Sequence, residues 1–201
     1  MSRKQMPEIN AGSMADIAFL LLIFFLVTTT MNVDSGILRK IAKKNEKQPE
    51  IKIKEKNILE VNINKNNELF VDEKIIQLKE LKQIAIDFID NGGGLGTNNT
   101  SCDWCTGNKD KTSSDHPSKA FIYIKPANTA NYETYITVLN DVNAAYTHLR
   151  NKLSAKIYKM NYVRLLEEVK KEGNNKNELL QKIKYIREKY PLLVSDSEIS
   201  N

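Results

Sequence analysis

The chain has 201 residues, enough for one ordinary domain with an extension, and a formal net charge of +5. This modest excess does not favour nucleic-acid binding, which usually needs a strongly basic patch. The sequence also lacks a Gly-rich phosphate loop, an HExxH motif and an internal repeat. We therefore expect a protein that is not an enzyme and has no cofactor and no bound metal.

One segment departs from the polar composition, because every residue from Ile17 to Val27 is apolar. Its flanks extend it to about twenty residues, the length that an α-helix needs to cross the hydrocarbon of a bilayer. We predict a short N-terminal tail over residues 1–13 and a single-pass transmembrane helix over residues 14–33. An uncleaved anchor is favoured over a signal peptide, because an acidic residue begins the apolar run and no Ala-x-Ala site follows it.

Asp16 is the single charged residue of the predicted span. An acidic side chain inside a bilayer costs about 2.5–3.5 kcal/mol on insertion scales, so it faces protein or water and is a functional candidate. A carboxyl group there can take up a proton from one side and release it to the other. The alternative is that Asp16 lies in the membrane interface, where an acid is tolerated. If it carries protons, another protein must enclose it. Helical spacing places these residues on its face: Gly12, Ser13, Leu20, Ile23, Val27 and Thr30.

A charged linker is predicted over residues 34–56, as an extended tether in which Ile51 and Ile53 alternate with lysines and could form a short strand. The distribution of basic residues predicts how the span is oriented in the membrane. Arg3 and Lys4 precede the span, whereas four basic residues follow it within the first part of the linker. The positive-inside count therefore favours a cytoplasmic C-terminus.

The hydrophobic pattern of residues 57–201 predicts a small α+β domain with the element order β-β-α-β-α and a late short strand. The strands follow from alternation and the helices from spacing of three and four residues. Asn131 is expected to cap a helix, and Tyr132, Tyr135 and Tyr146 are expected in the core. The expected elements are strands at Ile58–Ile63, Leu69–Val71, Ala120–Ile124 and Leu192–Val194, a helix from Leu78 to Ile89, a helix after Asn131, and two weaker helices at Tyr162–Lys171 and Glu178–Lys189 that pack on the domain or dock a partner.

Residues 92–118 are rich in Gly, Asn, Ser and Thr and are predicted to form an insertion loop. Within it, Cys102 and Cys105 form a CxxC motif. A local disulfide is the simplest outcome in an oxidising compartment, and free thiols or redox or metal chemistry are the alternatives. A zinc site would need two more ligands, and only His116 is near in sequence. Trp104, between the cysteines, is expected at an exposed loop tip.

The N-terminal motifs resemble the ExbD/TolR family. Glu8-Ile9-Asn10 matches a motif of the family's cytoplasmic tail, and Asp16 followed by Leu21-Leu22-Ile23-Phe24-Phe25 matches the start of its membrane helix. Two segments resemble the Bacteroidetes branch of ExbD: Ser-Met-Ala-Asp-Ile-Ala-Phe at the start of the predicted membrane helix, and Thr-Thr-Thr-Met near its end. One departure lies after the membrane segment, where Ile41-Ala42 replaces the Leu-Pro pair that many members carry.

The resemblance implies a subunit of a motor driven by the proton-motive force in the bacterial inner membrane. The N-terminus would be cytoplasmic and the C-terminal domain periplasmic, opposite to the charge count. Two copies would stand inside a pentameric ring of ExbB-like subunits, Asp16 would carry the protons, and the work would reach a TonB-like protein. The alternatives are a TolR-like, gliding or secretion stator subunit, a membrane-anchored periplasmic binding module, and an anchored thiol oxidoreductase using Cys102 and Cys105.

Overall fold

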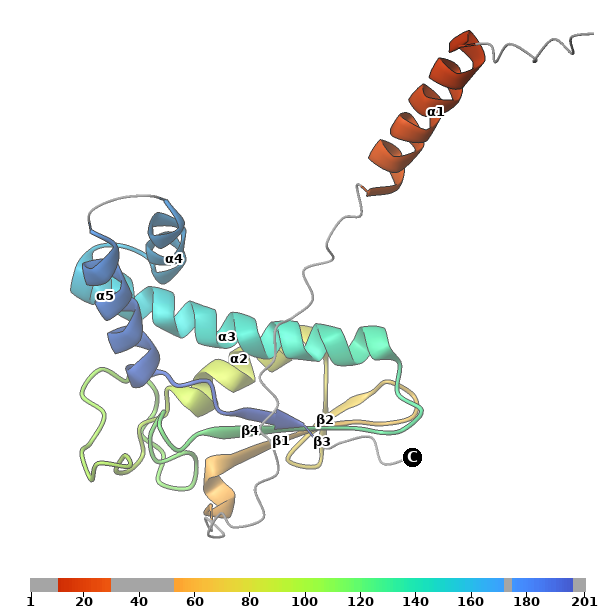
Figure 1. Cartoon of the computed structure of the whole chain (residues 1–201). Coiled ribbons are helices and arrows are strands. Elements are labelled where there is room, and N and C mark those ends of the chain that lie inside the picture. The colour runs from red at the N-terminus through yellow and green to blue at the C-terminus, as the bar shows by residue number, and fades with distance from the viewer. Residues whose placement is uncertain (1–10, 30–52, 172–174, 197–201) are drawn as a thin grey trace, which may run out of the picture. The chain divides into compact units, whose positions relative to one another are not determined.

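The computed structural model describes residues 11–29, 53–171 and 175–196. The chain divides into two compact units, Met1–Pro49 and Glu50–Asn201. In the first unit the described element is helix α1, Ala11–Thr29 (Figure 1). Among the described residues, no helix has the length and apolarity that crossing a membrane requires. The last four residues of the predicted span, 30–33, lie outside the described part of the chain, as does most of the predicted linker.

The second unit is a small α+β domain built on a five-stranded mixed sheet with the strand order β3-β2-β1-β4-β5. Strand β1 pairs antiparallel with β2 and parallel with β4, while β3 pairs antiparallel with β2 and β5 pairs parallel with β4. The predicted α+β class is therefore confirmed. The strands are β1 Ile58–Ile63, β2 Leu69–Val71, β3 Lys74–Ile76, β4 Phe121–Pro126 and β5 Val194–Asp196.

Alternation in β1 and β4 creates the buried face of the sheet. Leu59 and Val61 of β1 are buried and stand opposite Ile122 and Ile124 of β4, which are also buried. Because successive side chains of a strand point to opposite faces, the residues between them face the other side and are half-buried. One face of the sheet therefore carries the apolar core.

Helices α2, Leu78–Ile89, and α3, Tyr132–Tyr158, cover this face (Figure 1). Gln77 and Glu80 form a capping box at the start of α2. The predicted cap of α3 is confirmed, because Oδ1 of Asn131 accepts the Glu133 N–H at 3.0 Å. The core between helices and sheet includes Leu81, Ala85, Ile89, Val138, Val142, Tyr146 and Leu149.

Two further helices, α4 Tyr162–Lys170 and α5 Lys176–Lys189, gather at the C-terminal end of α3 (Figure 1). Leu165 of α4 and Ile186 of α5 are fully buried and join the core cluster. The guanidinium of Arg150 in α3 donates two hydrogen bonds to the Tyr190 carbonyl, which follows α5. The prediction that these helices pack on the domain is confirmed.

The sequence prediction was wrong at several points. It missed β3, and it placed the last strand at Leu192 although that strand begins at Val194. Ile53 is not in a strand, and Ile51 lies outside the described residues. Tyr132 is 74% exposed rather than part of the core.

Candidate functional site

Asp16 lies in the second turn of α1 and is exposed. Leu20 and Ile23 follow it at spacings of four and seven residues, so they share its face of the helix, and both are exposed. Ser13 and Val27 belong to α1, but their side chains are not described, and Thr30 lies outside the described residues.

The apolar side chains of α1 are exposed along the described helix. Phe19, Leu22 and Phe24 are each 59% exposed. Exposed contiguous apolar surface of this kind marks contact with lipid or with another protein. Asp16 is therefore the single carboxyl group of a helix whose described apolar side chains are exposed.

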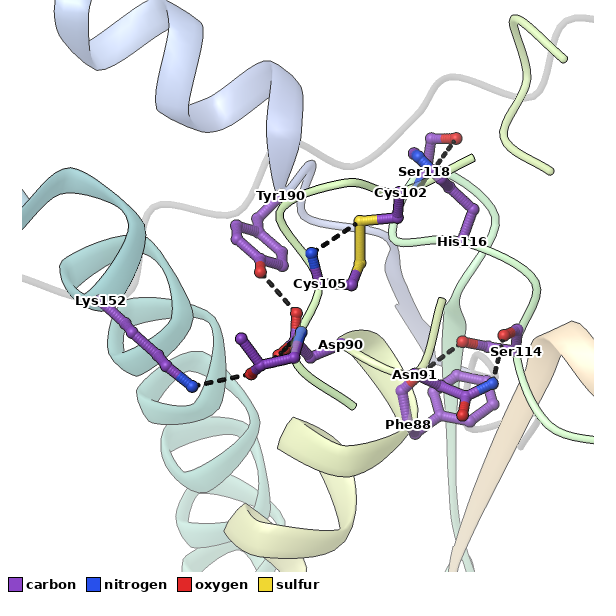
Figure 2. Close-up of a disulfide and its surroundings, with 11 residues drawn as sticks. Phe88, Asp90, Asn91, Cys102, Cys105, Ser114, His116, Ser118, Lys152 and Tyr190 are labelled. Atoms are coloured by element: carbon purple, nitrogen blue, oxygen red, sulfur yellow. Dashed lines mark hydrogen bonds between the residues drawn. A yellow bond between two sulfur atoms is a disulfide. The ribbon is translucent and has the colours of Figure 1, made fainter. Parts of the chain in front are cut away.

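The 92–118 loop begins where α2 ends, and its start is tied down by Asp90 and Asn91. Oδ1 of Asp90 accepts the Tyr190 hydroxyl at 2.6 Å, and Oδ2 accepts the backbone N–H and the hydroxyl of Thr106 (Figure 2). The amide of Asn91 donates to the carbonyls of Asp110 and Ser114. Both residues are buried, so their polar groups need these partners, and the partners fix the loop in place.

The other end of the loop is bound to the entrance of β1. The side chains of Asn57 and Asp115 are both buried, and Asn57 donates to Asp115 at 3.1 Å and accepts its backbone N–H at 2.7 Å. Nζ of Lys56 lies 2.5 Å from Oδ1 of Asp115. Burial alone would raise the pKa of Asp115, but its bonds to Lys56 and Asn57 outweigh burial and hold the pKa below its ordinary value.

Between these anchors, a disulfide joins Cys102 to Cys105 (Figure 2). Both cysteines are buried, and they lie in a loop rather than at the start of a helix. Gly92 packs against the disulfide with a φ of +66°, and a Cβ there would come within 3.0 Å of the Cys105 Cβ. A side chain at this position would therefore be strained by both its backbone and its neighbour.

Trp104 is not at an exposed tip, which corrects the sequence prediction. It is half-buried and packs against the core cluster. Its ring meets the ring of His116 edge to face, with centroids 5.3 Å apart, and Nζ of Lys189 lies 3.8 Å from its centroid. Sequence reasoning missed this cluster, because Lys189 comes from α5, far along the chain.

No cluster of His, Cys, Asp and Glu side chains within the described ranges 11–29, 53–171 and 175–196 is arranged to hold a metal ion. His116 bonds to Ser118, and the two cysteines are joined to each other. The three residues that a zinc site would draw on are thus engaged in other contacts.

Comparison with known proteins identifies the family. Residues 2–154 match the family model described as biopolymer transport protein ExbD/TolR. The chain belongs to the ExbD/TolR family. No curated protein and no solved structure matches it.

Membership in the ExbD/TolR family implies a subunit that energises biopolymer transport. The family is membrane-associated, and its members generally work with ExbB- or TolQ-type and with TonB- or TolA-type partners. The matched residues of this ExbD/TolR protein include α1, the 92–118 loop and most of α3. Helices α4 and α5 and strand β5 lie beyond them.

Proposed function

We propose that this chain is the ExbD-type subunit of an inner-membrane motor driven by the proton-motive force, and that it energises TonB-dependent transport across the outer membrane. Residues 14–33 form its single membrane-spanning helix, and Asp16 binds and releases the transported protons. The chain performs no covalent chemistry and uses no cofactor.

The observation that carries this proposal is the single carboxyl group on the apolar helix α1. Apolar side chains surround Asp16 in sequence, and those described are exposed. A helix of this kind is stable when lipid or other apolar helices cover it, and an ionisable residue placed there is expected to face protein or water. An ExbB-like ring around two copies of the chain would supply that surrounding, with Asp16 facing the ring.

The disulfide supports a periplasmic position for residues 50–201. Disulfides persist in oxidising compartments such as the bacterial periplasm and are rare in the cytosol. This observation favours the orientation implied by the family and opposes the count of basic residues on the two sides of α1. The buried position of Cys102 and Cys105 in a loop favours a structural role over thiol exchange, which needs an accessible thiolate.

The decisive experiment replaces Asp16 with asparagine in the full chain, expressed with its ring partner. Asp16→Asn keeps the shape of the side chain but cannot exchange a proton, so we expect energy-dependent uptake to be abolished. Copurification of the variant with the ring should remain normal. Asp16→Glu is the matched control, because it keeps the carboxyl group, and it should retain part of the uptake.

Full uptake with Asp16→Asn would remove the proton-carrying role and leave a membrane-anchored binding module. Normal copurification with a TolA-type partner in place of a TonB-type partner would assign the chain to the TolR-like alternative. A C-terminal alkaline phosphatase fusion tests the orientation, since that enzyme is active only in an oxidising compartment.

A further inference from the structure

A cavity of about 240 Å³ lies between the 92–118 loop and α5. Its wall includes Gly96 and Thr100 from the loop, Trp104 and His116, and Tyr185 and Lys189 from α5. Gly96 lies against the His116 ring, where a Cβ would come within 3.0 Å of Cε1 and Nδ1. The absence of a side chain there leaves the imidazole beside the cavity.

The imidazole of His116 carries a buried hydrogen-bond donor beside this cavity. Its Nδ1 accepts the Ser118 backbone N–H at 3.0 Å, and the Ser118 hydroxyl oxygen lies 2.9 Å from the same nitrogen (Figure 2). Because a backbone N–H can only donate, Nδ1 is unprotonated, and the neutral ring carries its proton on Nε2. Burial, followed by the charges of Lys119 and Lys189, lowers the pKa of His116 and keeps the ring neutral at neutral pH.

Trp104 adds a second donor of the same kind. Within the described part of the chain, Nε1 of Trp104 and Nε2 of His116 are buried nitrogens without a hydrogen-bond partner. The two rings meet edge to face at 89°. In such a pair only one ring points its edge at the face of the other, so the π-electrons can accept at most one of the two N–H groups. At least one buried donor of the pair therefore lacks an acceptor, and a buried unsatisfied donor is destabilising.

The charges around the cavity favour an anion. Nζ of Lys189 lies 3.8 Å from the Trp104 centroid, and the charges of Lys119 and Lys189 both act on His116. Glu188 also lines the cavity, but it is largely exposed and lies 3.9 Å from Lys184. Two N–H donors and an ammonium group match the two oxygens of a carboxylate, and a protonated Nε2 cannot bind a metal.

We propose that this cavity is a binding site for a carboxylate group, held by Nε1 of Trp104, Nε2 of His116 and the ammonium group of Lys189. Both ring nitrogens are covered in the structure, so Trp104 turns away from His116 when the carboxylate enters. The carboxylate comes from a small acid or from the C-terminus of a polypeptide. This site belongs to the second unit, and it does not depend on proton transfer at Asp16.

Trp104 is the single tryptophan of the sequence, so tryptophan fluorescence, excited selectively over the tyrosines, reports on this site alone. The full chain in detergent is titrated with sodium acetate against sodium chloride at equal ionic strength. We expect a saturable change of emission with acetate and none with chloride. Lys189→Met should weaken binding about tenfold, because it removes a charge-assisted hydrogen bond. His116→Phe, which keeps a ring but no donor, should weaken it at least as much.

The matched control is His148→Gln, which changes the exposed second histidine on α3 and should leave binding unchanged. Tetra-alanine with a free C-terminus, compared with its amide, separates the two sources. Binding of the acid form alone points to a polypeptide end, and binding of acetate without the peptide points to a small acid.

A response to acetate that matches chloride, or one that His116→Phe leaves intact, would overturn the proposal. Nitrogen-15 spectra of histidine-labelled wild-type chain provide a reading that needs no variant. The Nε2 resonance of His116 should move with acetate while that of His148 stays, and an unmoved His116 resonance would also overturn the proposal.

Discussion

In α1, Ile17, Phe19 and Leu22 are each 59% exposed, whereas Leu81, Ile122 and Ile186 of the second unit are fully buried. The same kinds of side chain are thus treated differently in two parts of one protein. Removing apolar surface from water stabilises by about 25 cal/mol per Å², so the second unit gains most of its stability from its own core. The apolar side chains described in α1 are exposed, and contact with lipid or with another protein would supply this gain.

The carboxyl groups of the two regions differ in the same way. Asp90 and Asp115 are buried in the second unit, and hydroxyl, amide and ammonium groups of that unit bind them. Asp16 is exposed on an apolar helix. The second unit thus supplies partners to its own buried acids, whereas the side chain of Asp16 is exposed on α1.

The largest expected loss of stability comes from a substitution in the hydrophobic core. Ile122→Ala should lower the free energy of unfolding of the second unit by about 2–5 kcal/mol, because it leaves a cavity under α2 and α3. Leu22→Ala in α1 is the matched variant and should leave this free energy unchanged. Urea unfolding of the full chain in detergent, followed by circular dichroism, measures both. Equal destabilisation by the two variants would break the distinction between self-covered and externally covered regions.

The second-largest expected loss of stability comes from removing a buried carboxyl group. Asp90→Ala removes the acceptor of the Tyr190 hydroxyl and of two Thr106 groups, so we expect a loss of about 1–3 kcal/mol in the free energy of unfolding. Asp87→Ala, at an exposed position of α2, is the control and should cost much less. A small loss for Asp90→Ala would mean that the loop is not anchored through this residue.

Loss of the disulfide should have a comparable or smaller effect. Cys102 and Cys105 are three residues apart, and closing so short a loop contributes about 2 kcal/mol in the chain-entropy model. The double substitution Cys102→Ser with Cys105→Ser should therefore lower the midpoint of thermal unfolding modestly. Reducing agent should lower the wild-type midpoint similarly and leave the variant unchanged. A reductant effect on the variant would assign the loss to something other than this bond.

The smallest expected effect is the loss of folding stability at low pH that comes from Asp115. Folding lowers the pKa of Asp115 below its ordinary value of about 3.9, so the unfolded chain binds its proton first as pH falls. The contribution of Asp115 to stability is complete above that value and is lost as pH falls through the folded pKa. Lys56→Met should reduce this contribution by less than about 1 kcal/mol, because the lysine is partly exposed.

Denaturant unfolding at pH 7 and at successively lower pH, with Lys79→Met as an exposed control on α2, follows the acid effect. The stability difference between Lys56→Met and wild type should shrink as the pH falls below 4. A difference that stays constant with pH would contradict the ion pair between Lys56 and Asp115.

The elements that the sequence predicted well are those with local signals. The alternation of Ile58–Ile63 gave β1 with its exact bounds, and the spacing of Leu78, Leu81, Ala85 and Phe88 gave α2. Asn131 could be recognised as a cap because its side chain serves its own helix. In these places the deciding contacts lie within a few residues of each other.

Strand β3 was missed because its turn has an unusual sequence. Asp72 and Glu73 connect β2 to β3, and both have positive φ; Asp is common at the first position of such a turn, but Glu73 stands where Gly is expected. The last strand was misplaced because its position is set by parallel pairing, in which Val194 stands opposite Ile122 of β4. That contact joins residues far apart in sequence, and a three-residue strand has too little pattern of its own.

The CxxC motif pointed to the loop, but the cluster beside it could not be predicted. Trp104 is half-buried because His116 and Lys189 lie against its ring, and their approach depends on where α5 ends. The role of Asp90 in anchoring the loop could not be predicted either, because Tyr190, whose hydroxyl it accepts, is 100 residues away in the sequence.

The parallel pairing of β1 with β4 and of β4 with β5 bears on how the protein is made. Synthesis delivers the chain from its N-terminus, so β1 emerges before β4, and β4 emerges before β5. Until Val194–Asp196 arrives, one side of β4 has unpaired backbone groups, a surface on which chains aggregate. The sheet is complete only after Val194–Asp196 has been synthesised, so ribosome stalling or proteolysis before this strand would leave an incomplete domain that is prone to aggregate.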